Sequence, residues 1–311
     1  MCWIAPGILG FGLMACVSGD PESSGQEIPV MLHAGNVTKA IVNEGDAFQP
    51  LLLCSAVQND FTVTEWQKNV SVAADGTVAY QEEIPNYPHQ GDYIYVAGIY
   101  PSTGSVSGGK AVFHLDGRTD LMYAPGLAGN RWNGFRIYGN SDPSKDKTLQ
   151  FGHLLTQLQL TAIRTASELT GKKEFRILSI RLKNIPQQAS VRLGVPAEGE
   201  ERVVWSDPVT QQPVYFKDAS DTSKNTLITS SDPDNPDRVG WILLPPEASY
   251  QADIETTVGN FSDIRIRPDE GEFTGGLAHR VVLILNDKGL SVMGVKKEDW
   301  ADTDGGEIEM N

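Results

Sequence analysis

Cysteine is scarce in this sequence, with three residues among 311. Cys2 and Cys16 lie within the first 16 residues, so Cys54 stands alone in the remainder of the chain. A disulfide framework or a zinc cluster needs several cysteines at fixed spacings, and the sequence therefore predicts neither. Cys54 ends a run of three leucines and is interpreted as a small buried hydrophobic residue.

Basic residues are also few relative to acidic ones. Lysine and arginine together number 25 against 40 aspartates and glutamates, which gives a formal net charge of −15. The negative charge is spread along the chain and does not form one block. This distribution argues against nucleic acid or anionic lipid as a partner and is typical of a soluble surface.

Sequence signatures of catalysis are missing as well. The five histidines are scattered without ligand spacing, and there is no Gly-x-Ser-x-Gly, P-loop or Cys-x-x-Cys motif. Two acidic stretches, Ser231 to Asp237 and Asp302 to Glu307, have some likeness to calcium loops, but solvated loops are the better interpretation. We therefore expect no catalytic residues, no metal site, no cofactor and no enzymatic activity.

The N-terminal stretch does carry a recognisable signal. An uncharged, mostly apolar run ends in Leu13-Met14-Ala15-Cys16, the pattern that closes a lipoprotein signal peptide. The run is too short to span a bilayer as a helix. The pattern predicts a signal peptide over residues 1–15, lipidation at Cys16, and a flexible acidic tether over residues 16–27.

A strand with one apolar face follows the tether. Ile28, Val30, Leu32 and Ala34 recur at period two, which is typical of a half-buried strand. A turn-like stretch then leads to Lys39 and Ala40. A trypsin-like protease cutting between these two residues would set the first strand free.

The rest of the chain alternates short apolar runs with turn residues. This pattern predicts an all-β protein of β-sandwich type. An irregular stretch, Pro125 to Lys147, divides two strand-rich halves, so we expect an N-terminal sandwich over residues 28–145 and a C-terminal one over residues 146–311. The polar stretch Ser220 to Arg238 is predicted to be a long surface loop.

Several segments in this order resemble the fimbrillin-like lipoproteins of Bacteroides and its relatives, which are the subunits of type V pili. The segments are the run ending at Cys16, the strand before Thr38-Lys39-Ala40, Asp120 to Ala124, Leu149 to His153, and a C-terminal pattern of Phe273 to Gly276, two strands and Trp300. The resemblance implies two transthyretin-like Greek-key β-sandwich domains in tandem. It also implies export to the outer membrane surface, then incorporation into an extracellular fimbria that supports adhesion.

The resemblance implies an assembly mechanism too. A trypsin-like protease removes the first strand, and a donor strand from the next pilus subunit fills the vacated groove. In a shaft subunit the donor would be the C-terminal part, Leu290 to Met310. Physical chemistry agrees, because a groove without its strand exposes apolar side chains and unpaired backbone groups that strand addition satisfies together.

A second function class remains open from the residues themselves. Trp132, Trp205 and Trp241 are candidates for a sugar-stacking platform, which would make the protein a lipid-anchored surface glycan-binding protein. The competing interpretation is core packing, which the surrounding apolar residues favour for Trp241.

Overall fold

The structure is a computed structural model that describes residues 27–36, 48–57, 60–135, 147–165, 174–213, 215–216, 225–286 and 289–298. Strands and irregular segments, with no helix, make up these ranges, so the all-β prediction is confirmed. Within them, no helix is long and apolar enough to cross a membrane. Cys16, Lys39, Ala40 and Trp300 lie outside the described residues.

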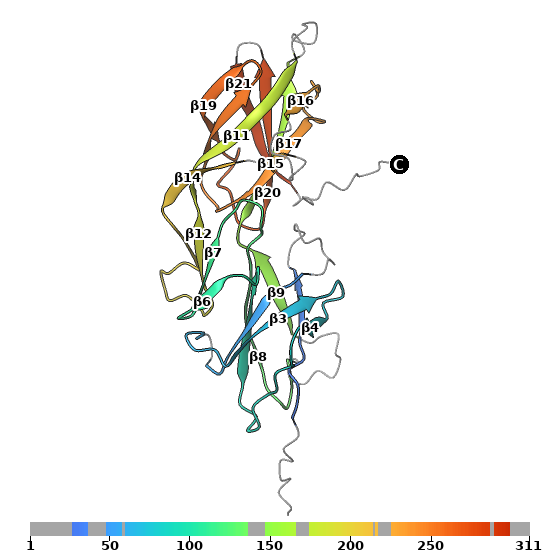
Figure 1. The fold of residues 1–311 in the computed structure, drawn as a ribbon, viewed down its shortest axis with the longest axis vertical. Coiled ribbons are helices and arrows are strands. Elements are labelled where there is room, and N and C mark those ends of the chain that lie inside the picture. The colour runs from blue at the N-terminus through green and yellow to red at the C-terminus, as the bar shows by residue number, and fades with distance from the viewer. Residues whose placement is uncertain are drawn as a thin grey trace, which may run out of the picture.

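Four sheets form two sandwiches stacked along the long axis of the molecule (Figure 1). The lower sandwich pairs a seven-stranded sheet with a four-stranded one. In spatial order the seven-stranded sheet contains β1 (His33–Asn36), β9 (Thr148–His153), β8 (Met122–Gly129), β5 (Ile94–Tyr100), β2 (Leu51–Ser55), β3 (Trp66–Val72) and β4 (Val78–Tyr80). The four-stranded sheet contains β13 (Val203–Trp205), β12 (Gln188–Arg192), β7 (Lys110–His114) and β6 (Ser105–Ser107).

The upper sandwich packs two five-stranded groups around one apolar core. One sheet has the order β15 (Tyr215–Phe216), β17 (Asp237–Leu244), β10 (Thr156–Arg164), β20 (Ala278–Asn286) and β21 (Gly289–Glu298). The other has β14 (Pro208–Pro213), β11 (Phe175–Pro186), β18 (Tyr250–Thr256) and β19 (Gly259–Ile266), with β16 (Thr226–Ile228) also pairing with β11. Alternate residues of β18, namely Tyr250, Ala252 and Ile254, point into the core, as the two-residue period of a strand requires.

The sheets do not follow the expected division at residue 145. β9 pairs with β8, and β12 pairs with β7, so strands from the second half complete the lower sandwich. The 12-residue strand β11 makes this possible, because about 3.3 Å of rise per residue carries it roughly 40 Å along the molecule. Only Gln187 separates β11 from β12. Whether the two sandwiches fold as separate domains stays a prediction.

One predicted loop contains regular structure. Within Ser220 to Arg238, β16 pairs with β11 and buries Ile228, and β17 begins at Asp237. The Asp237 carboxylate also accepts a hydrogen bond from the backbone N–H of Ser230 at 2.7 Å, which stabilises the turn between β16 and β17. The prediction of a long surface loop is therefore wrong for β16 and the start of β17, because one buried isoleucine and strand pairing outweigh a polar composition.

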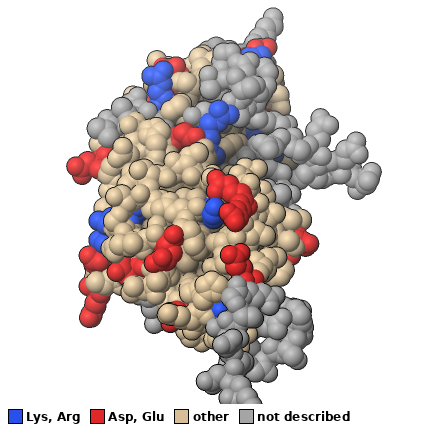
Figure 2. Space-filling view, turned by 60° about the horizontal axis from the view of Figure 1, so that its bottom comes forward, with Lys and Arg blue, Asp and Glu red and all other residues tan. Residues whose placement is uncertain are grey.

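The seven-stranded sheet is covered on both faces. On β2, Leu51 and Leu53 face the four-stranded sheet, while Leu52 and Cys54 face a separate cluster on the other side. This arrangement explains why residues 51–54 form an unbroken apolar run. Among the described residues no further sheet lies against the second face, and residues Ile28 to Ala34 supply part of its cover. On the surface, acidic side chains are dispersed over the face shown in Figure 2.

Candidate functional site

The first segment of the described chain lies in a groove with backbone partners on both edges. On one edge β1 runs parallel to β9, with His33 opposite Thr148 and Asn36 opposite Phe151. The other edge is antiparallel, where His33 bridges to Thr77 and Pro29 to Asn86. The segment therefore connects the β9 edge of the seven-stranded sheet to the turn that precedes β4.

Backbone hydrogen bonds hold the segment along the antiparallel edge. The Val30 amide donates to the Pro85 carbonyl oxygen at 2.8 Å, and the Ala34 amide donates to that of Gly76 at 2.9 Å. The Ile28 carbonyl oxygen accepts the amide of Tyr87 at 2.9 Å. Removal of the segment would leave these groups of the groove without their partners.

The side chains of the segment alternate between core and surface. Val30, Leu32 and Ala34 are buried and Ile28 is partly buried, whereas Met31 is 59% exposed and His33 is exposed. The buried side chains belong to the cluster on the face of the seven-stranded sheet that is turned away from the four-stranded sheet, and this cluster also includes Phe48, Val72, Met122 and Phe151. Burying a valine or leucine contributes about 1.5–3 kcal/mol, so the segment stabilises the sheet substantially.

A buried acid–histidine pair lies at one end of the same sheet. His153 Nδ1, at the end of β9, contacts Asp120 Oδ2, just before β8, and both side chains are almost fully buried. The Asp120 carboxylate also accepts the Leu121 amide at 2.8 Å. The pair links the end of β9 to the start of β8, and this geometry fits a structural role in joining two strand ends.

The loop after Phe273 packs closely against this strand end. A Cβ on Gly275 would lie 2.8 Å from the Leu154 carbonyl oxygen, which only glycine avoids. The Gly276 amide donates to the Leu155 carbonyl oxygen at 2.8 Å. The Phe273 to Gly276 motif noted in the sequence is thus part of the junction between the two sandwiches.

The three tryptophans considered as a sugar platform are not brought together in one surface. Trp241 is 8% exposed and part of the core, and Trp205 is partly buried against the same core cluster. Trp132 is 65% exposed. The hypothesis of a sugar-stacking platform made of these three residues is therefore wrong, because Trp241 is buried in the core and Trp205 packs against it.

Cys54 lies on β2, beside β3 in the same sheet, and its thiol is buried. Burial, followed by the nearby Glu65 carboxylate, raises the pKa of the Cys54 thiol to about 12. Among the residues that the structure describes there is no group of three or more His, Cys, Asp or Glu side chains able to hold a metal ion. The acidic stretch from Asp302 lies outside them.

Fold and groove together define the class: an all-β, two-sandwich protein whose first segment completes a sheet from its own chain. The model of the fimbrillin-like family matches residues 38–300, and the chain belongs to that family. The resemblance found in the sequence is thereby confirmed.

Solved structures share the fold at low sequence identity. A protein assigned to cell adhesion from Bacteroides uniformis is 15% identical, with a TM-score of 0.53, and the match covers 88% of this chain and 99% of that one. Another, from Bacteroides ovatus, is 11% identical with a TM-score of 0.52, covering 89% and 99%. No curated protein sequence matches the chain.

Proposed function

We propose that the protein is a structural subunit of a cell-surface fimbria that assembles by exchange of its first strand. The observation that carries the proposal is the segment Ile28 to Asn36, which is hydrogen-bonded on both edges and buries three apolar side chains. Membership of the fimbrillin-like family supports the same conclusion. The assembled fimbria would support adhesion.

The cleavage step follows from the place of the basic residue. Lys39 lies three residues beyond the end of β1, so a trypsin-like protease cutting before Ala40 would leave the segment attached by non-covalent contacts alone. Loss of the segment exposes the β9 edge, the Gly76 and Pro85 carbonyl oxygens, and the apolar side chains beneath the segment. A strand from another subunit satisfies these groups together, whereas water satisfies only the polar ones.

The pairing of β21 limits which residues are available to act as the donor strand. Residues Gly289 to Glu298 pair with β20 along the length of β21, and Val295 is buried in the upper core. These residues already stabilise their own sandwich. We therefore place the donor of the next subunit in residues 299–311, beyond β21, and not in the whole of Leu290 to Met310.

Delivery to the surface would begin with lipidation at Cys16, and the outer membrane would hold the protein until processing releases it into the fimbria. Labelling cells with a lipid precursor should mark the wild-type protein and leave Cys16→Ala unmarked. Equal labelling of both would remove the anchoring step from the proposal.

Assembly is tested by treating the full uncut chain with a trypsin-like protease. The expected result is a ladder of multimers that withstands mild detergent, because backbone pairing and apolar burial act together. Lys39→Ala should stay monomeric, and Lys110→Ala, an exposed lysine in β7, serves as the matched control.

A truncation after Glu298 separates donor from acceptor. It keeps β21 and the upper core, so it should fold, cap chains as an acceptor, and fail to extend them. A ladder that persists with Lys39→Ala, or that forms equally well from the truncated chain alone, contradicts strand exchange in this form.

A further inference from the structure

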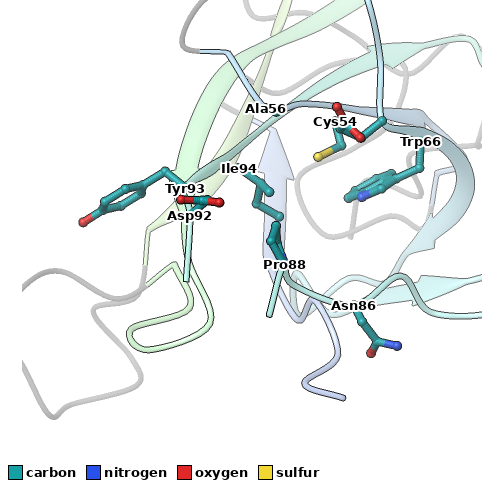
Figure 3. Close-up of a pocket in the computed structure, with 9 residues that line it drawn as sticks. Cys54, Ala56, Trp66, Asn86, Pro88, Asp92, Tyr93 and Ile94 are labelled. Atoms are coloured by element: carbon teal, nitrogen blue, oxygen red, sulfur yellow. The ribbon is translucent and has the colours of Figure 1, made fainter. Parts of the chain in front are cut away.

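A cavity of about 550 Å³ opens at the end of the lower sandwich, between the start of β3, the loop before β5 and the end of β2 (Figure 3). Its apolar part is formed by Cys54 and Ile94, which are buried, and by Trp66, which is partly buried against the core cluster. Packing of its ring against that cluster restrains the Trp66 indole. The Cys54 thiol is neutral, as its raised pKa requires, so this part of the lining carries no charge.

Polar groups surround the apolar part. Glu65, Asp92 and Asn86 line the cavity and are all exposed. Neither the Glu65 nor the Asp92 carboxylate has an ion pair among the described residues. The Asn86 amide donates to Glu27 Oε2 at 3.1 Å, which leaves its carbonyl oxygen and second N–H for another partner.

We propose that this cavity binds a saccharide, with a pyranose ring stacked on Trp66 and its hydroxyls hydrogen-bonded to Glu65, Asp92 and Asn86. A pyranose has an apolar C–H face and a rim of hydroxyls, and the cavity offers an aromatic wall and a rim of acceptors in the same arrangement. The volume lies within the range of small-molecule sites. A single ammonium group would fill only part of it and would leave the apolar lining without a partner.

An exposed aromatic residue, Trp132, lies against the loop that carries Asp92. The Trp132 ring lies against Gly91, the residue before Asp92, so closely that a Cβ on Gly91 would lie 2.1 Å from Trp132 Nε1. The Arg131 guanidinium lies 5.0 Å from the Trp132 ring centroid and contacts the His89 carbonyl oxygen, which restrains the indole further. Trp132 thus offers a second stacking surface, and the site accommodates more than one sugar unit.

The proposal goes beyond strand exchange and does not depend on it. Calorimetry on the full uncut chain with a panel of neutral monosaccharides and short oligosaccharides should show saturable binding for at least one. Asp92→Asn and Trp66→Ala should each raise its Kd by about tenfold or more, equivalent to about 1.4 kcal/mol. Trp66→Phe, which preserves core packing better, should weaken binding less, and Trp132→Ala should affect oligosaccharides more than monosaccharides.

Glu83→Gln, an exposed carboxylate outside the cavity, is the matched control and should bind as the wild type does. Thermal melting of each variant checks that the fold is retained. The proposal is overturned if no saccharide binds, if binding is unchanged in Asp92→Asn and Trp66→Phe, or if a lysine-rich peptide binds the cavity in place of sugars.

Discussion

Ala34 and Gly76 lie in direct backbone contact across the antiparallel edge of the groove. The Ala34 amide donates to the Gly76 carbonyl oxygen at 2.9 Å, and a Cβ on Gly76 would lie 2.9 Å from the Ala34 carbonyl oxygen. Gly76 has a φ of +83°, so its turn conformation and its approach to the first segment both favour glycine.

Gly76→Ala should therefore loosen the first segment. We expect a trypsin-like protease to cut the variant protein at Lys39 faster than the wild type, as followed by mass spectrometry. We also expect the variant to have a lower thermal unfolding midpoint. Gly199→Ala is the control, because Gly199 has a similar φ of +80° and nothing within 4 Å of its Cβ position. Equal effects of the two substitutions would mean that backbone strain alone, and not contact with the segment, explains the result.

Leu32→Ala should destabilise the uncut protein by about 2–5 kcal/mol, because it removes a buried side chain from the cluster under the groove. Met31→Ala changes the neighbouring residue, which points outward, and should alter stability by no more than about 0.5 kcal/mol. Urea unfolding of both variants measures the difference. Similar losses would show that the segment does not hold its alternating orientation.

Asp120→Asn and His153→Gln should each destabilise the protein, since each removes one partner of a buried pair. The double variant should cost less than the sum of the two, with a coupling energy of about 0.5–3 kcal/mol. A double-mutant cycle by urea unfolding provides the measurement. Strict additivity would indicate that the two side chains do not interact in solution.

His279 should make the stability depend on pH. Burial, followed by the charge of Lys297, lowers the pKa of the His279 imidazole below its ordinary value of 6.5. The imidazole packs edge-on against the Phe273 ring, with 4.8 Å between the two ring centroids. The unfolded chain then binds a proton at a higher pH than the folded chain does. This contribution to stability is complete above about pH 6.5 and is lost as the pH falls below it.

His279→Phe should flatten the pH dependence of the unfolding free energy between about pH 5 and 7 relative to the wild type. His114→Phe, at an exposed position on β7, should leave the dependence as it is. Unchanged pH profiles for both variants would exclude His279 as the cause.

The period-two pattern of Ile28 to Ala34 was accessible from the sequence because strand side chains alternate regardless of what covers them. Its partners were not. The segment pairs with the turn before β4, more than 40 positions away in the sequence, and with β9, more than 110 positions away. No local pattern encodes such pairing. The cavity beside Trp66 could not be predicted from the sequence for the same reason, because Glu65, Asn86 and Asp92 come together only in the folded chain.

The sequence by itself determined the all-β class, the alternating first segment and the family, because these rest on local periodicity and on motifs in a fixed order. Only the tertiary structure decided that β9, β12 and β13 cross the expected boundary, and that Trp241 is core while Trp132 is exposed. Hydrophobic burial is non-directional, so an apolar residue specifies that it will be buried but not against which partner. The partner is chosen by sheet pairing between distant segments, which the complete fold alone defines.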